Sequence, residues 1–392
     1  MSTAIESAGL SETQRQIVEL ARDVARRRIQ PHAAEWDRTA QLPRDVINEL
    51  GTLGFLGLLT PEADDGMGLD TLTYLLALEE LAAADAGLAL SVGIQHVVQS
   101  GLLLPHGSAA QRERWLRPLA RGELLAGIAL AEADAGSDAA ALRAQAVRQG
   151  DGWVLTGTKA WVTNGATADV VIVLARTAAP RPATELPDAQ GISAFIVPTD
   201  VAGYRLGERV DTMGLRASNT VSITLDNLRL EPEHLLGEEG SGLTYAMEAL
   251  DAGRLGTAIV AVGIARRALE HAVAYCAERK QFGRALREFE AVQFKLADMA
   301  TRVEAARALT HAAAVRRDHG EDITRQASMA KLLASETAMW VTTQAVQLFG
   351  GYGYMRDFPV EKLFRDAKGT EIVDGTSEMQ RLVIARGLYQ GG

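Results

Sequence analysis

The sequence predicts a mainly α-helical protein with a β domain in the middle of the chain. Helical periodicity dominates both ends, where apolar residues recur three and four positions apart. Between them lie short β-type runs bounded by glycines and polar turns. At 392 residues the chain is long enough for more than one domain, and 47% hydrophobic residues can form a large core. We therefore expect an N-terminal α-helical domain over residues 1–122, a β domain over 123–235 and a C-terminal four-helix bundle over 236–392.

The first domain opens with a helix start signal. Ser11 and Gln14 have the spacing of a capping box, in which each side chain bonds the other residue's backbone N–H. Ile17, Leu20 and Val24 then recur at helical spacing. Further helical patterns cover residues 46–50 and 72–84, separated by a turn at 61–66. Little in this part of the chain indicates a strand.

The middle of the chain changes to strand patterns. Residues 170–174 and 192–197 are continuous apolar runs typical of buried strands, and residues 221–225 alternate apolar and polar side chains. The segment 178–191, rich in proline and alanine, is expected to be a surface loop. Because no crossover helices separate these runs, we expect an antiparallel sheet or small barrel.

Four amphipathic segments follow, which indicate an antiparallel bundle. Leu255, Ile259 and Val262 share one helical face. The other three segments are the pattern through Val292, Leu296, Met299 and Val303, the pattern over residues 323–348, and a pattern that begins after Asp374.

Composition excludes several classes of protein. A net charge of −10 argues against a nucleic-acid partner or an anionic membrane surface. The single cysteine, Cys276, excludes an internal disulfide. Residues 1–6 lack the positive charge and the apolar core of a signal peptide. No apolar run approaches the roughly 18 residues of a membrane span. We expect a cytoplasmic protein without a metal site.

The stretch from residue 347 to 386 contains the main candidate for catalysis. A glycine cluster at 350, 351 and 353 permits a positive φ and close approach of another group. Asp374 follows, a carboxylate between apolar residues where a new helix begins. The ordinary interpretation of such an aspartate is a helix N-cap, and the functional one is a base.

Other motifs are also open to two interpretations. Residues 131–138 form a small-residue acidic loop that could present backbone N–H groups to a ligand, or be an ordinary loop. Trp161 and Thr163, two apart, would share one face of a strand, so the ring could stack on a flat cofactor or pack in the core. Residues 279–284 are basic and could bind pyrophosphate or end a helix in solvent. Asp251 and Arg254 have the spacing of an ordinary helical ion pair. The glycines at 237, 240 and 242 lack the flanking strand and βαβ unit of a Rossmann fingerprint.

The order of these motifs resembles that of the acyl-CoA dehydrogenase family, FAD-dependent enzymes that convert acyl-CoA thioesters to 2-enoyl-CoA. The resemblance covers nearly the full length and is closest to the short- and branched-chain members. It rests on residues 132–138, 161–165, 279–283, 347–353 and 375–378. The fold that it implies agrees with the architecture predicted above.

The resemblance implies a role for each motif. Trp161 would lie beside the flavin, Thr163 would hydrogen-bond the ring near N5, and the loop residues Ala131 and Ser137 would lie near the cofactor. Asp374 would remove the α-proton of the substrate. The FAD-binding residues that approach the partner subunit's cofactor would be Arg279, Phe282, Gln347, Gly350 and Gly351, and those that contact the cofactor of the same subunit would be Thr376 and Glu378. The substrate-binding residues would be Ser137, Asp251, Arg254 and Gly375.

Several residues depart from the family pattern. Most relatives have glutamate where this chain has Asp374, and relatives without it place a glutamate at the position of Gly253. Asp374 is therefore the best candidate for the base, although its carboxylate is retracted by about 1.3 Å, and a 1 Å misplacement can cost about a hundredfold in rate. Ala131 replaces a usual threonine and Ala133 a usual proline.

Three functions remain open from the sequence. The first is an acyl-CoA dehydrogenase that passes electrons to an electron-transfer flavoprotein and assembles as a homotetramer, a dimer of dimers. The second is a flavin oxidase like nitroalkane oxidase, which the aspartate favours. The third is a non-catalytic acyl-CoA-binding relative. We expect the floor of the acyl pocket near residues 86–97 and the helix after Ser241.

Overall fold

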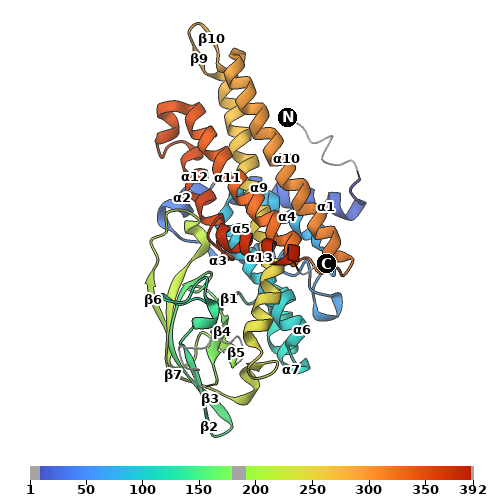
Figure 1. Cartoon of the computed structure of the whole chain (residues 1–392), viewed down its shortest axis with the longest axis vertical. Coiled ribbons are helices and arrows are strands. Elements are labelled where there is room, and N and C mark those ends of the chain that lie inside the picture. Colours follow the sequence, from blue (N-terminus) through green and yellow to red (C-terminus); the bar gives the residue numbers. More distant parts are fainter. Residues whose placement is uncertain (1–8, 179–190, 390–392) are drawn as a thin grey trace.

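The structure, a computed structural model, describes residues 9–178 and 191–389. Most helices from both ends of the chain lie together in one half of the molecule, and the sheet occupies the other half with the short helices α6 (Leu104–His106) and α7 (Ala109–Gln111) beside it (Figure 1). The two helical parts share a single hydrophobic core, which includes Leu78 of the first part and Ile259 of the last. Residues 1–6, considered above as a signal peptide, lie outside the described residues. So do residues 179–190, which make up most of the expected surface loop.

The N-terminal helices follow the predicted pattern. Ser11 caps the first helix through both bonds of the predicted capping box, at 2.9 and 3.1 Å to Gln14. Asp85 breaks the helical run in an extended conformation, and its carboxylate accepts from the N–H of Leu88 at 2.8 Å, which starts the next helix. The helices are α1 (Glu12–Val24), α2 (Ala33–Thr39), α3 (Arg44–Thr52), α4 (Thr71–Ala84), α5 (Ala86–His96), α6 (Leu104–His106), α7 (Ala109–Gln111) and α8 (Arg117–Ala120).

One helical run among the described residues, Ala86–His106, is long and apolar enough by composition to cross a membrane. It comprises α5, the π-helical turn η3 (Val97–Leu103) and α6. The sequence patterns did not predict this long apolar helix, because polar residues interrupt its apolar residues. Since 78% of its most apolar window is buried inside the protein, the run has the environment of a core helix.

The sheet differs in one respect from the purely antiparallel sheet that we expected. In the described residues it has eight strands, of which seven follow the order β6-β7-β3-β2-β4-β5-β8, and β1 pairs with β4. The β1–β4 and β2–β4 pairs are parallel, so the sheet is mixed. The strands are β1 (Ala126–Ala129), β2 (Gln145–Gln149), β3 (Gly152–Val162), β4 (Val170–Arg176), β5 (Ile192–Pro198), β6 (Tyr204–Arg209), β7 (Val221–Leu230) and β8 (Leu235–Leu236).

The C-terminal part contains the predicted helices and one that the sequence patterns missed. The predicted helices are α9 (Gly242–Glu278), α10 (Glu290–Asp318), α11 (Thr324–Phe349) and α13 (Ser377–Tyr389). The fifth, α12 (Pro359–Thr370), lies in a segment that looked merely polar. Its buried apolar residues are only Val360, Leu363 and Ala367, and the other buried positions, Asp366 and Thr370, are polar. Proline at its first position suits a helix start, where the missing N–H has no partner to lose.

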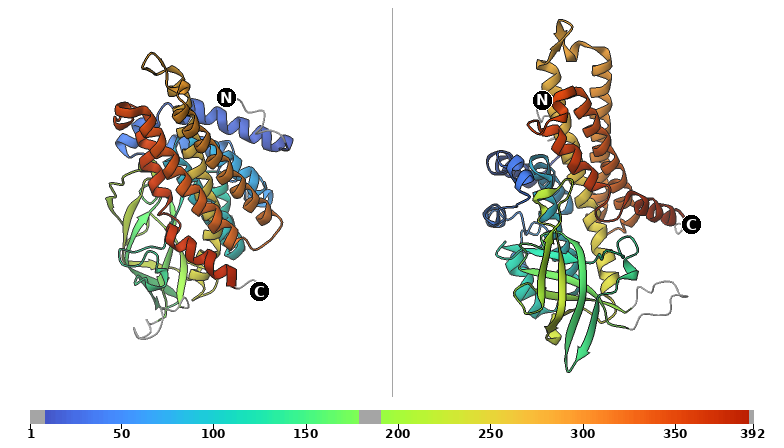
Figure 2. Two further views of the ribbon diagram at one scale, coloured as in Figure 1. Left: turned by 45° about the horizontal axis from the view of Figure 1, so that its top comes forward. Right: turned by 90° about the vertical axis from the view of Figure 1, so that its left-hand side faces the viewer.

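The long helices α9 and α10 project beyond the rest of the molecule. The short hairpin of β9 (Lys280–Gln281) and β10 (Arg284–Ala285) connects them and forms the tip of this projection (Figures 1 and 2). The sheet lies at the opposite end of the long axis (Figure 1). Residues near this tip are therefore far from the sheet of the same chain.

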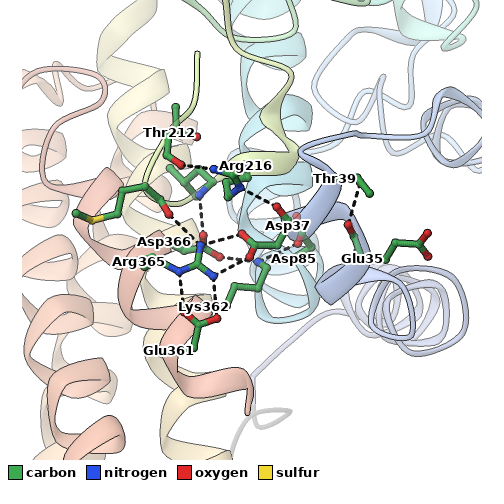
Figure 3. A network of polar contacts seen from close by, with 12 residues as sticks. Glu35, Asp37, Thr39, Asp85, Thr212, Arg216, Glu361, Lys362, Arg365 and Asp366 are labelled. Carbon is green, nitrogen blue, oxygen red and sulfur yellow. Dashed lines mark hydrogen bonds and ion pairs between the residues drawn. The ribbon is translucent and has the colours of Figure 1, made fainter. Parts of the chain in front are cut away.

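A polar network joins the three parts of the chain (Figure 3). Arg365 of α12 pairs with the carboxylate of Asp37 in α2 at 2.7 Å. Arg216, between β6 and β7, donates to the backbone carbonyl of Asp37 at 2.8 Å. Three residues before Arg365, Lys362 pairs with the fully buried Asp366 of the same helix at 2.6 Å. The network fixes α12 against the N-terminal helices and the β domain.

Candidate active site

Asp374 lies in the turn between α12 and α13, with its carboxylate directed at α9. Its φ is 54° and that of Gly375 is 90°, so two consecutive residues are in the left-handed region. This conformation is uncommon for a residue other than glycine. It turns the side chain toward Thr257 of α9, whose hydroxyl donates a 2.5 Å hydrogen bond to Asp374 Oδ2.

The interpretation of Asp374 as a helix N-cap is wrong. Helix α13 begins at Ser377, and the side chain that accepts from its first turn belongs to Thr376, with Met379 N at 3.4 Å. The Asp374 carboxylate is bonded to another helix instead. A left-handed aspartate held away from the cap position is a conformation with a cost, which is typical of functional sites.

Two side chains from the last helices hold this turn in place. Lys331 of α11 is fully buried and donates to the carbonyl oxygen of Gly375 at 2.8 Å. Gln380 of α13 donates to the carbonyl oxygens of Asp374 and Gly375 at 3.1 and 2.9 Å. Burial lowers the pKa of Lys331 to about 8, against the opposing effect of the Asp374 charge. Sequence reasoning missed both residues, although a lysine on the buried face of residues 323–348 was a visible signal.

Gly253 of α9 faces the same carboxylate. A Cβ at this position would lie 3.7 Å from Asp374 Oδ2 and 3.3 Å from a methyl group of Val97. The position where some relatives carry a glutamate therefore opens onto the same space as Asp374. With glycine there, position 253 places no side chain between the α9 backbone and the carboxylate.

The predicted ion pair on α9 is present beside Gly253. Arg254 contacts the carboxylate of Asp251, which also accepts from the Thr324 hydroxyl at 2.7 Å. Burial raises the pKa of Asp251, and the Thr324 hydrogen bond and the Arg254 charge oppose this effect. Arg254 is itself buried, and its Nε has no hydrogen-bond partner among the described residues.

The prediction that Trp161 and Thr163 share one face of a regular strand is wrong. Trp161 has φ 54° near the end of β3, where the pairing with β7 becomes irregular, and Thr163 lies in the turn beyond the strand. The Trp161 side chain is 55% exposed, so it is not a core tryptophan. The buried Asn164 fixes the turn by donating to the carbonyl oxygens of Ser91 and Ala126 at 3.1 and 2.9 Å.

The small-residue loop that carries Ala131 and Ser137 is anchored by a buried ion pair. Glu132 accepts from the fully buried Lys159 of β3 at 2.7 Å and from two backbone N–H groups. Ala131 O accepts from Ala160 N at 2.9 Å, so the loop runs beside the strand that ends in Trp161. Ser137 is exposed in this loop.

The remaining predicted cofactor residues gather near the tip of the helical projection. A groove of about 530 Å³ is lined by Arg279, Gly350 and Gly351, together with aromatic residues that include Tyr352. The Arg279 guanidinium lies 5.5 Å from the centre of the Tyr352 ring. Beside the groove, Phe282 is 94% exposed in the β9–β10 turn, and Gln347 is exposed on α11.

The predicted site residues thus lie in three places: at the end of β3 and its adjoining loop, around the turn at Asp374, and near the tip of the helical projection. Around the turn at Asp374 lie Gly375, Thr376, Glu378 (exposed in the first turn of α13), Asp251 and Arg254. The group at Arg279 and Gly350 occupies the far end of the long helices, and the sheet lies at the opposite end of the molecule (Figures 1 and 2). One chain does not bring the residues near the tip together with those at the other two places.

Three family models match the chain in order. They are the acyl-CoA dehydrogenase N-terminal domain over residues 11–123, the middle domain over 127–228 and the C-terminal domain over 240–389. The short-chain specific acyl-CoA dehydrogenase of mouse mitochondria is 42% identical over 385 residues, which cover 98% of this chain and 92% of the mouse protein. The chain belongs to the acyl-CoA dehydrogenase family.

Solved structures agree with this assignment. Butyryl-CoA dehydrogenase from Megasphaera elsdenii has a TM-score of 0.93 at 38% identity and covers 99% of this chain and 100% of its own. A chain solved in work on the electron transferring flavoprotein of Acidaminococcus fermentans also has a TM-score of 0.93, at 41% identity, covering 97% of this chain and 98% of that chain. The predicted family and fold are confirmed.

The family uses FAD, which confirms the predicted cofactor. A glutaryl-CoA dehydrogenase from Mycobacterium smegmatis, 32% identical to this chain with a TM-score of 0.90 over 97% of this chain and 95% of that chain, is solved in complex with FADH2. The residues present here fit such a group. The half-exposed Trp161 ring offers a stacking surface, and the groove at Arg279 offers a cation beside Gly350 and Gly351, where an added Cβ would meet no atom within 4 Å.

Proposed function

We propose that the chain dehydrogenates a short acyl-CoA thioester to the 2-enoyl-CoA, with Asp374 as the base that removes the α-proton. The general activity, acyl-CoA dehydrogenation, is that of the family to which the chain belongs. The observation that supports Asp374 is its strained turn, which directs the carboxylate at Thr257 and at the open position of Gly253. A short acyl group is the substrate class of the mouse and Megasphaera relatives by name.

The base needs a fixed orientation and free lone pairs. The Thr257 hydroxyl occupies Oδ2, which leaves Oδ1 to accept the α-proton of the substrate. Lys331 and Gln380 hold the carbonyl groups of Asp374 and Gly375, so the turn keeps its geometry as the proton moves.

The thioester carbonyl gains negative charge when the α-proton leaves. A backbone N–H at the base, in the turn that contains Asp374 and Gly375, is suited to donate to this oxygen. Arg254 and Asp251 on α9, and Ser137 in the anchored loop, are the residues assigned to the CoA side of the substrate. The buried Nε of Arg254 without a partner supports a contact that the protein alone does not provide.

FAD, when bound, supplies the acceptor for the hydride from the β-carbon. On the side of the flavin, this chain contributes Trp161 and Thr163 at the end of β3, and Thr376 and Glu378 at the start of α13. Arg279, Phe282, Gln347, Gly350 and Gly351 would bind the FAD of a neighbouring subunit. The separation of the two groups within one chain supports a site shared between subunits and a homotetramer built as a dimer of dimers.

We further propose that the electrons leave to an electron-transfer flavoprotein in the cytoplasm. The Acidaminococcus structure, solved in work on such a flavoprotein, supports a partner of this kind. The alternative activity of a flavin oxidase would need neither this partner nor CoA.

An anaerobic titration tests the proposal. Butyryl-CoA added to the purified FAD-containing protein is expected to bleach the main flavin band, and a non-catalytic relative would leave the band unchanged. Oxygen uptake with nitroethane, in the absence of any thioester effect, would instead establish the oxidase. Bleaching by butyryl-CoA with slow reoxidation in air would establish the dehydrogenase.

A further inference from the structure

We propose that Tyr74 of α4 is the floor of the acyl pocket and limits the substrate to short acyl chains. This inference rests on the proposed function and deepens it, because it names the residue that selects the substrate. Tyr74 is 4% exposed, and its hydroxyl has no hydrogen-bond partner among the described residues. A tyrosine that is almost entirely buried usually has a hydrogen-bond partner for its hydroxyl.

Two glycines make room for the Tyr74 hydroxyl. A Cβ at Gly256 of α9 would lie 3.2 Å from this oxygen, and a Cβ at Gly93 of α5 would lie 3.8 Å from it. The hydroxyl therefore fills the gap between α5 and α9 where neither helix has a side chain. The ring is held from the other side by His96, with ring centres 4.4 Å apart.

The same face of α9 carries the base. Gly253, opposite the Asp374 carboxylate, and Gly256, opposite the Tyr74 hydroxyl, are three residues apart and thus neighbours on the helix surface. Positions three apart on a helix are separated by about 5–6 Å, so the carboxylate and the hydroxyl are at most about 13 Å apart. Val97 of η3 borders the space between them.

This separation sets the length of the acyl group. About 7 Å of this separation is taken up at its two ends. At one end lies the hydrogen-bond distance between the carboxylate and the α-carbon, and at the other the van der Waals distance between the hydroxyl and the last carbon. The remaining length is therefore at most about 6 Å, roughly four or five extended carbon–carbon bonds. Butyryl and hexanoyl groups fit this length and an octanoyl group does not.

The Tyr74 hydroxyl also stays neutral. Burial is the main cause that raises its pKa, the Asp374 charge raises it further, and the half-buried Arg317 opposes both. The floor is thus an uncharged phenol against which a terminal methyl group can pack. An ionised phenol would instead carry a negative charge, which an apolar methyl group does not compensate.

The test is the chain-length profile of two variants at one position. Tyr74→Ala removes the ring, and Tyr74→Phe keeps it and serves as the matched control. Specificity constants are measured with butyryl-, hexanoyl- and octanoyl-CoA and a dye as electron acceptor. We expect the octanoyl-to-butyryl ratio to rise at least about tenfold in Tyr74→Ala and less than about threefold in Tyr74→Phe.

A ratio in Tyr74→Ala within about twofold of the unchanged protein, with normal FAD content, overturns the inference. If Tyr74→Ala does not fold, Gly93→Ala decides. Its added methyl group makes an ordinary 3.8 Å contact with the hydroxyl and should lower the hexanoyl-to-butyryl ratio at least about threefold. An unchanged ratio there also overturns the inference. Absence of flavin reduction by every thioester in the unchanged protein would refute the proposed function itself, which is a separate outcome.

Discussion

The buried ammonium group of Lys331 donates a 2.8 Å hydrogen bond to the carbonyl oxygen of Gly375, the residue that follows Asp374. Burial lowers the pKa of Lys331 from 10.5 to about 8. Between these two values the unfolded chain binds a proton that the folded chain has released. The free energy of unfolding due to Lys331 therefore rises with pH across this window, by up to about 3 kcal/mol, and is lost as the pH falls from 10.5 to 8.

Lys331→Met removes this titration. The free energy of unfolding of the unchanged protein, minus that of the variant, should rise by about 3 kcal/mol between pH 8 and 10.5. Urea denaturation of both proteins at several pH values measures the difference. Lys280→Met, at an exposed lysine, is the control and should give a flat difference. A difference that is equally flat for Lys331→Met would mean that folding does not lower the pKa of this lysine.

Asp374→Asn should retain FAD but lose substrate-dependent flavin bleaching by about a hundredfold or more, because the amide cannot accept the α-proton. The amide oxygen can still accept from Thr257, so the turn should keep its geometry. Stopped-flow absorbance with butyryl-CoA measures the loss. Asp357→Asn, at an exposed carboxylate before α12, is the control. Unchanged bleaching in Asp374→Asn would place the base elsewhere.

The base should be movable to α9. Asp374→Gly removes it, and adding Gly253→Glu places a carboxylate where the Cβ would lie 3.7 Å from the original Oδ2. The double variant should bleach the flavin at least about tenfold faster than Asp374→Gly alone. Equal rates in the two variants would show that the position of Gly253 does not reach the substrate.

The Thr257 hydroxyl should matter for the rate through the orientation of the base. Thr257→Val keeps the shape of the side chain and removes the 2.5 Å hydrogen bond to Asp374. We expect a loss of about tenfold in kcat with little change in FAD content. Thr257→Ser restores the hydroxyl and should recover most of the rate. A serine variant as slow as the valine variant would point to lost packing instead.

Phe282 should be required for assembly and for FAD retention together. It is 94% exposed in this chain, at the turn between β9 and β10. Phe282→Asp is expected to lower the FAD content of the purified protein and the molar mass by light scattering, which for the unchanged protein should be that of a tetramer. Val147→Asp, at an exposed position on β2, is the control. A monomer that retains FAD would refute the shared site.

The sequence predicted those parts of the fold that repeat a pattern over many residues. Leu255, Ile259 and Val262 all lie buried on α9, and residues 170–174 and 192–197 form β4 and β5. Periodicity did not predict a helix where only a few apolar residues repeat at helical spacing. Helix α12 has only three buried apolar residues, and its charged residues Lys362 and Arg365 pair with residues far away in the chain. Such long-range ion pairs leave no local pattern.

The site was predicted by the order of its motifs more than by local geometry. Asp374 was identified from its place in the chain, but its left-handed conformation and its bond to Thr257 depend on a contact 117 residues away in sequence. Tyr74 and Gly256 were not singled out, because each looks like an ordinary core residue of its own helix. Their relationship exists only after α4 and α9 pack together.

The distance between the Arg279 groove and the Asp374 turn has a genetic consequence. If each active centre takes its groove from one chain and its base from another, a chain defective only at Arg279 and a chain defective only at Asp374 can repair each other. A mixed assembly of the two would contain one centre in which both contributions are intact. Two inactive alleles expressed together would then restore growth that neither supports alone.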